Sequence, residues 1–192
     1  MINYMRPGRR RSQAAMVKKG EVMGNIYHRT LGYTQALIAL IPAALGILAF
    51  ANDITGYQGT IAHVVHPILC MEKTFGIPAQ TWRAICYPAF THGATVLVMT
   101  LELGTGLLAL WGAYRMARAV PLGKAAMRQG VAIVSLACLL GFVVWVGGFY
   151  VVLGDWFLAW QDETLNDVRL DGAVYGTVVL LCLFAVNYEP RD

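Results

Sequence analysis

Four long runs of apolar residues divide the chain, and each is long enough to cross a bilayer as a helix. They cover residues 31–51, 89–113, 130–153 and 170–188. A helix rises about 1.5 Å per residue, so roughly 20 apolar residues match the hydrocarbon thickness. The pattern therefore predicts an all-α integral membrane four-helix bundle. The first run is longer than the apolar core of a signal peptide, so we expect an uncleaved anchor that Pro42 kinks.

Polar segments of very different length separate these runs. A basic tail, residues 1–29, comes first, and a long segment, residues 52–87, joins the first two runs. A connection of about 36 residues with no obvious helix is usually functional or packed against something. A basic turn, residues 114–129, and a short C-terminal tail, residues 189–192, complete the predicted organisation.

The composition favours a membrane protein over a soluble one. Hydrophobic residues make up 57% of the chain and charged residues only 14%, with a mean hydropathy of +0.54. Soluble domains carry about 25% charged residues. The net charge of +4 does not predict a nucleic-acid partner, because the basic residues cluster beside the apolar runs.

The distribution of lysine and arginine predicts the orientation in the membrane. Twelve of the 15 basic residues lie in the two tails and the basic turn, and three lie in the segments on the other side. Cytoplasmic segments carry the excess of basic residues. We therefore expect a multi-pass protein of the bacterial cytoplasmic (inner) membrane, with both termini in the cytoplasm (N-in/C-in) and the long loop outside.

Two ionisable residues stand out in the second run. Glu102 lies near the predicted midplane, where a carboxyl group needs a partner, a water-filled cavity or a proton. It is either a proton-relay or ligand acid, or a protonated carboxyl that fixes helix register. His92 lies roughly 15 Å nearer the outer interface and about 80° around the helix axis, so the two do not face each other. Haem ligation between helices is not favoured, because the other three histidines lie outside the apolar runs.

The predicted outer mouth of the bundle gathers polar and aromatic residues. Tryptophan and tyrosine are expected there as an interfacial belt, but Arg83 and Asp155 lie at similar depth and could pair in a partly dry site. The candidates for a ligand pocket or a structural polar cluster are Arg83, His92, Glu102, Asp155, Trp156, Trp160 and Gln161. No catalytic residue and no metal-ligand spacing stands out, so neither an enzyme nor a metal site is predicted.

Cysteines and glycines indicate where the chain is held together. Cys70 and Cys86 are 16 positions apart in a segment predicted to face an oxidising compartment, which makes them candidates for a disulfide. Small residues at Gly141 and in the G-x-x-x-G of Gly172 and Gly176 allow close helix approach.

Several spaced motifs resemble one family. They are Trp82-Arg83-Ala84-Ile85, Pro88, His92, Glu102, Gly141, Trp145, Gly148-Phe149, Gly154-Asp155-Trp156-Phe157 and Trp160-Gln161. The set is similar to the predicted small integral membrane proteins catalogued as domain of unknown function 2165, over roughly residues 52–161. The resemblance implies four membrane helices and no established activity. Asp155 stands where the family usually has glutamate, and Pro67 where it has a histidine, so the resemblance gives His66 no role.

Three functions are compatible with these features. Small size, small-residue helix faces and the lack of a large soluble domain favour a non-catalytic accessory subunit of a larger respiratory or photosynthetic membrane complex, with other subunits and lipid as partners. The alternative is a binding site for quinone, lipid or haem at the outer mouth, and no other cofactor is expected. A small proton-coupled carrier using Glu102 is disfavoured, because the runs lack broken, charge-lined helices.

Overall fold

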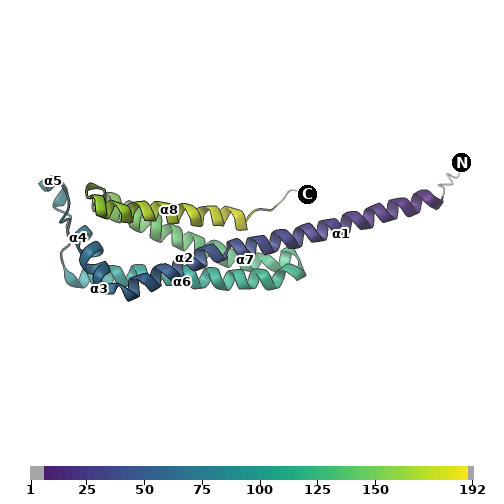
Figure 1. Ribbon diagram of the computed structural model, residues 1–192, viewed down its shortest axis with the longest axis horizontal. Helices are drawn as coiled ribbons and strands as arrows, with labels where there is room; N and C mark the ends of the chain where they lie inside the picture. The colour runs from purple at the N-terminus through teal and green to yellow at the C-terminus, as the bar shows by residue number, and fades with distance from the viewer. Residues whose placement is uncertain (1–6, 190–192) are drawn as a thin grey trace.

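The chain folds as a bundle of four long helices with several short helices at one end (Figure 1). The computed structural model describes residues 7–189, except for the side chains of residues 7–15, 17 and 21. Helices account for nearly all of the described residues, and no strand occurs among them. The predicted all-α fold is confirmed.

Within the described part of the chain, four helices are long and apolar enough to cross a membrane. They are Lys18–Thr55, Pro88–Leu122, Lys124–Trp156 and Glu163–Val186. Each contains most or all of one predicted apolar run and continues past it by at least a turn at one end. The extra turns carry polar and charged residues, whose side chains find polar partners in the interfacial region. The hydropathy pattern therefore does not reveal these ends of the helices.

The first span consists of two helices in line. They are α1, Pro7–Ile38, and α2, Leu40–Thr55, interrupted only at Ala39. Pro42 accounts for the interruption, because proline offers no N–H to the carbonyl four residues before it and its ring crowds that carbonyl.

The predicted basic tail is largely helical. From residue 7 onward it forms the start of α1, which projects from the bundle (Figure 1). Residues 1–6 of this tail, and residues 190–192 of the C-terminal tail, lie outside the described residues.

Helix α6, Pro88–Ala119, packs against two of the other long helices. It packs against α2 on one side and against α7, Lys124–Phe142, on another. Helix α7 continues as the π-helix η3, Val143–Trp156, which packs against α8, Glu163–Val186. A single 3-10 turn, Val120–Leu122, joins α6 to α7, so these neighbours are antiparallel.

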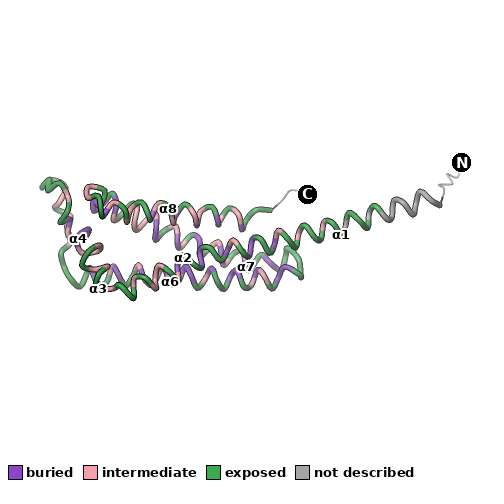
Figure 2. The backbone as a smooth tube through the Cα atoms, viewed as in Figure 1, coloured by how far each residue is buried: buried purple, intermediate pink, exposed green. Residues whose placement is uncertain are grey.

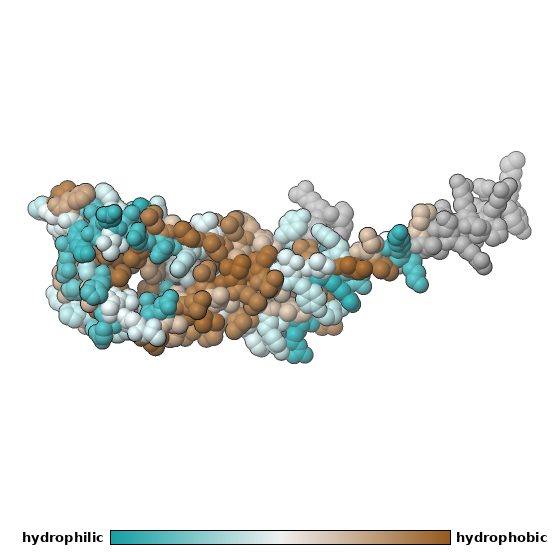
Figure 3. Space-filling model, in the orientation of Figure 1, coloured by the Kyte–Doolittle hydropathy of each residue, from teal (hydrophilic) through white to brown (hydrophobic). Residues whose placement is uncertain are grey.

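The outside of the bundle is apolar, unlike the surface of a soluble protein. Leu37, Leu97, Leu181 and Phe184 are all more than half exposed. Buried residues recur along the long helices (Figure 2), and a band of apolar residues crosses the middle of the molecule (Figure 3). This distribution is the one that a surrounding hydrocarbon solvent requires.

Short helices fill much of the segment that was predicted as a loop. Helix α3, Tyr57–Thr60, the π-helix η1, Ile61–Val65, and α4, His66–Leu69, follow one another directly, and α5, Pro78–Thr81, comes later. Each is too short for hydrophobic periodicity to reveal it. We call this end of the bundle the loop end, and the opposite end, from which α1 projects and at which α8 ends, the terminal end.

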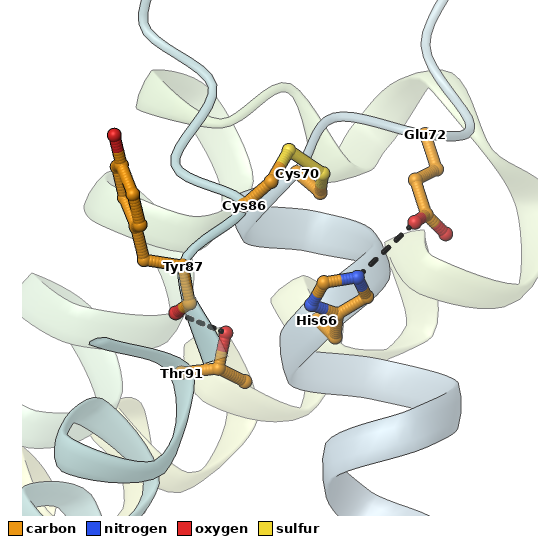
Figure 4. Close-up of polar contacts among 6 residues, drawn as sticks. All are labelled: His66, Cys70, Glu72, Cys86, Tyr87 and Thr91. Atoms are coloured by element: carbon orange, nitrogen blue, oxygen red, sulfur yellow. Dashed lines mark hydrogen bonds and ion pairs between the residues drawn. A yellow bond between two sulfur atoms is a disulfide. The ribbon is translucent and has the colours of Figure 1, made fainter. Parts of the chain in front are cut away.

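A disulfide fastens the loop end to the second span. Cys70 and Cys86 are bonded, with their Cα atoms 4.7 Å apart (Figure 4). Beside the disulfide, the Ile85 N–H donates to the Leu69 carbonyl oxygen at 2.8 Å. The segment after α4 is therefore tied to the residues just before α6 by both a covalent bond and a backbone hydrogen bond.

Candidate functional site

A cavity of about 400 Å³ lies inside the bundle near the loop end. Helices α2, α6, η3 and α8 form its walls, and residues of η1 and α4 line the side toward the loop end. The space-filling view shows the molecule hollowed near this end (Figure 3). Most of the lining is apolar. Ligand pockets of about 300–1,000 Å³ are typically apolar with a few polar groups, which describes this cavity.

Glu102 is the most deeply buried polar group of the cavity wall. It is 2% exposed, and its Oε1 accepts a hydrogen bond from Trp145 Nε1 at 3.3 Å. The carboxyl group of Asp53 lies close enough to interact with it electrostatically, and Asp53 also interacts with the Thr60 hydroxyl. No donor among the described residues reaches Glu102 Oε2. The bundle therefore shelters Glu102 from lipid but leaves one of its oxygens unsatisfied.

The two carboxyl groups meet because α2 and α6 run in opposite directions. Side chains on a helix lean toward its N-terminus. Glu102 on α6 therefore leans toward the loop end, and Asp53 on α2 leans away from it. On the side of this pair toward the terminal end, the backbones of α2 and α6 are nearly in contact, since a Cβ added to Gly46 would lie 2.5 Å from the backbone nitrogen of Gly106.

The cavity lining is acidic and aromatic. Among the described residues, its charged side chains are all acids, namely Asp53, Glu102 and Asp171. Five aromatic side chains also line it: Phe90, Trp145, Phe149, Phe157 and Tyr175. Trp145 and Tyr175 meet edge to face, with ring centroids 5.8 Å apart. The cavity thus combines acidic groups with aromatic surface, and no lysine or arginine of the described residues lines it.

Both π-helices contribute to this lining. Val64 and Val65 come from η1, while Trp145 and Phe149 come from η3. A π-helix has a wider turn than an α-helix, and π-helical turns occur often at functional sites. The same apolar residues would suit an α-helix equally well, so the sequence carries no signal for this feature.

His92 lies apart from the cavity. Its Nδ1 is 2.9 Å from the Tyr57 hydroxyl, which links α6 to α3. The His92 side chain is exposed, and no histidine of the described chain lines the cavity. The cavity therefore offers no axial histidine for haem.

Arg83 contacts an aromatic ring instead of Asp155. Its guanidinium lies over the Trp156 ring, 4.9 Å from the centroid, and Trp82 meets the same ring edge to face. Asp155 is exposed, and within the described residues no ion pair joins it to Arg83. Arg83, Trp82 and Trp156 form a cation–π cluster at the loop end. Neither these three residues nor Asp155 line the cavity.

Trp160 and Gln161 hold the segment that precedes α5. The Phe75 N–H donates to Gln161 Oε1 at 2.8 Å. The Phe75 ring also packs against Trp160, with centroids 5.9 Å apart. Neither Trp160 nor Gln161 lines the cavity, so their contacts stabilise the fold of the loop end.

A group of possible metal ligands also lies at the loop end. The ligand atoms of His66, Cys70 and Glu72 are within 4.8 Å of one another. The Cys70 sulfur is committed to the disulfide, and His66 Nε2 pairs with Glu72 Oε1 at 3.3 Å (Figure 4). Because the sulfur is no longer a thiolate, this group is not a candidate metal site.

The glycines predicted to mediate helix packing lie at tight contacts around Trp145 and Val146. A Cβ at Gly141 would lie 2.7 Å from the Trp145 ring, and a Cβ at Gly172 would lie 2.7 Å from the Trp145 carbonyl oxygen. A Cβ at Gly176 would collide with the Val146 side chain. Gly172 and Gly176 let α8 approach η3 closely, and Gly141 leaves room for the Trp145 ring.

Sequence reasoning missed two acids of the cavity. The hydropathy pattern ends the first run at residue 51 and so assigns Asp53 to the loop, and it places Asp171 at the outer edge of the fourth run. The usable signal for Asp53 was its spacing of seven residues from Gly46, because positions i and i+7 share a helix face. Trp145 was singled out through the family motif and not through its pairing with Glu102.

Comparison with known proteins identifies the family of the chain. A family model described as "Predicted small integral membrane protein (DUF2165)" matches residues 31–187. This range includes every residue that lines the cavity. No curated protein and no solved structure shows significant similarity to the chain.

Proposed function

This chain belongs to the DUF2165 family of predicted small integral membrane proteins, and on that premise we propose that it binds a small lipophilic molecule within the bilayer. The observation that supports this proposal is the cavity of about 400 Å³, with an unsatisfied Glu102 oxygen in its wall. A buried carboxyl without a full set of partners is costly in a membrane. A ligand that supplies the missing partner would remove that cost.

The lining narrows the chemistry of the ligand. Apolar and aromatic walls suit a ring system or an acyl chain, as in a quinone or a lipid. Haem receives no support, because a histidine ligand is missing from the described lining. The proton-coupled carrier considered from the sequence would use the same Glu102, and no further observation favours it.

We propose that the loop end faces away from the cytoplasm in a bacterial cytoplasmic membrane. The excess of lysine and arginine at the terminal end supports this orientation. The disulfide between Cys70 and Cys86 supports it independently, because disulfides persist in oxidising compartments. Under this topology, the cavity lies in the outer half of the bilayer.

Cysteine labelling tests the orientation. A membrane-impermeant reductant applied to spheroplasts should expose Cys70 and Cys86 to an impermeant maleimide. The other cysteines, Cys138 and Cys182, are buried in the bundle and should stay unlabelled. The double variant Cys70→Ser, Cys86→Ser is the control and should give no signal. Labelling only after the membrane is permeabilised would reverse the proposed topology.

A matched pair of variants on α6 tests ligand binding. Val98 lines the cavity, whereas Val96 is 51% exposed and does not line it. Organic extraction of the chain purified in mild detergent should yield a lipophilic molecule in near-stoichiometric amount. Val98→Trp fills the cavity and should reduce the yield at least about tenfold, since the added side chain occupies the space of the ligand. Val96→Trp should retain it.

Two outcomes of this experiment count against the proposal. One is a wild-type protein that carries no lipophilic molecule and takes up none of an added quinone analogue. The other is equal retention by Val98→Trp and Val96→Trp. Thermal unfolding of both variants shows whether each is folded.

A second candidate function is that of an accessory subunit. The projecting part of α1 carries large exposed apolar side chains outside the predicted hydrocarbon region: Val22, Met23, Ile26 and Tyr27. A partner membrane protein would cover them. In the same purification, a stoichiometric protein that is lost on Met23→Asp would support this role, and a monodisperse monomer would argue against it.

A further inference from the structure

We propose that the ligand of the cavity is a lipophilic cation, an organic ammonium or a related onium ion with apolar or aromatic substituents. This inference rests on the proposed function and specifies the substrate class for the same site. It is drawn from the charges that line the cavity, from the unsatisfied oxygen of Glu102 and from the aromatic lining.

The charges of the lining have one sign. Asp53 and Glu102 interact electrostatically, and Asp171 also lines the cavity, from α8. Two adjacent carboxyl groups in an apolar site are stable together only with a proton or another positive charge between them. A cationic ligand would provide that charge.

Arg83 and Arg169, near the loop end, contact aromatic rings that are not part of the cavity lining. The Arg83 guanidinium lies over Trp156, and the Arg169 guanidinium lies over Tyr150, each 4.9 Å from the ring centroid. Arg169 Nε also donates to Asn166 Oδ1. Among the described residues, no lysine or arginine lines the cavity, so no basic side chain of the lining neutralises its acids.

The geometry at Glu102 provides an acceptor for a ligand donor. Trp145 Nε1 donates a hydrogen bond to Glu102 Oε1. Glu102 Oε2 has no donor among the described residues, although Glu102 is only 2% exposed. An ammonium N–H of a ligand would donate to Oε2. A quaternary cation would instead contact the pair through charge alone.

The aromatic lining adds a second feature that recognises cations. Phe90, Trp145, Phe149, Phe157 and Tyr175 come from three long helices and the loop end. Aromatic faces attract organic cations through their quadrupole, and they also contact apolar substituents. Carboxyl groups and aromatic rings together distinguish an organic cation from a neutral quinone and from a hydrated metal ion.

Two probes of the same shape and opposite charge test the proposal. Tetraphenylphosphonium should bind the purified chain at least about tenfold more tightly than tetraphenylborate, because the charge contrast acts in a desolvated site. Asp53→Asn and Glu102→Gln should each weaken tetraphenylphosphonium binding by about tenfold or more. Glu163→Gln and Asp167→Asn serve as matched controls, because these acids of α8 are exposed and lie outside the cavity. Each should change the affinity for tetraphenylphosphonium by less than about twofold.

The outcomes separate this inference from the proposed function. Binding of a neutral quinone without preference for tetraphenylphosphonium would overturn the inference and leave the proposed function standing. Tetraphenylphosphonium binding that survives both cavity substitutions would also overturn it. If no probe binds, neutral or charged, both the inference and the proposed function are wrong. If thermal unfolding shows that Glu102→Gln does not fold, the affinity of Asp53→Asn for tetraphenylphosphonium alone tests the inference.

Discussion

Replacing Trp145 by alanine should lower the free energy of unfolding by about 4 kcal/mol or more, from the cavity left behind and the lost hydrogen bond. Trp145 is 1% exposed and packs against Tyr175 and Gly141. Removing a buried tryptophan costs about 3–5 kcal/mol in packing. It also leaves Glu102 Oε1 without its donor, and an unsatisfied buried acceptor costs about 1–3 kcal/mol more.

Three further variants separate these contributions in thermal or denaturant unfolding in detergent. Trp111→Ala is the matched control, because Trp111 is 51% exposed and should cost less than about 1 kcal/mol. Trp145→Phe keeps most of the packing and removes the donor, so it should cost about 1–3 kcal/mol. In a Glu102→Leu background that cost should largely vanish, since the acceptor is gone. An equal cost of Trp145→Phe in both backgrounds would show that the hydrogen bond contributes nothing.

The architecture could be predicted because hydropathy in a bilayer is a strong constraint. Any helix that crosses the membrane must be apolar over most of its length, so the spans are visible as apolar runs. The need for shelter around Glu102 follows from the same constraint, because a mid-membrane carboxyl must have polar company. In the structure that company is Trp145 and Asp53.

The site itself could not be predicted, because it depends on how the helices pair. Asp53 follows an apolar run by two residues, and only the antiparallel packing of α2 on α6 carries it to Glu102. The cation–π contact of Arg83 with Trp156 likewise replaces an ion pair that depth alone suggested. Hydropathy locates residues along the membrane normal, whereas contacts depend also on rotation about each helix axis.

Helix pairing depends in turn on glycines whose close approach to a neighbour is not visible in the sequence. Gly106 and Gly104 are two positions apart on α6, yet their surroundings differ. A Cβ at Gly106 would lie 2.7 Å from the Ile47 backbone nitrogen and 3.1 Å from the Ala43 carbonyl oxygen. A Cβ at Gly104 would meet only the Leu140 side chain, at 3.6 Å, which is an ordinary contact.

Gly106→Ala should therefore destabilise the bundle by about 2–3 kcal/mol, because neither backbone can yield without separating α2 from α6. Gly104→Ala should be neutral or stabilising by up to about 1 kcal/mol, through helix propensity alone. Thermal unfolding of the two variants in the same detergent makes the comparison. If Gly106→Ala proved as stable as Gly104→Ala, α2 and α6 would not be in backbone contact. The packing that brings Asp53 to Glu102, and with it the acidic cavity, would then lose its physical basis.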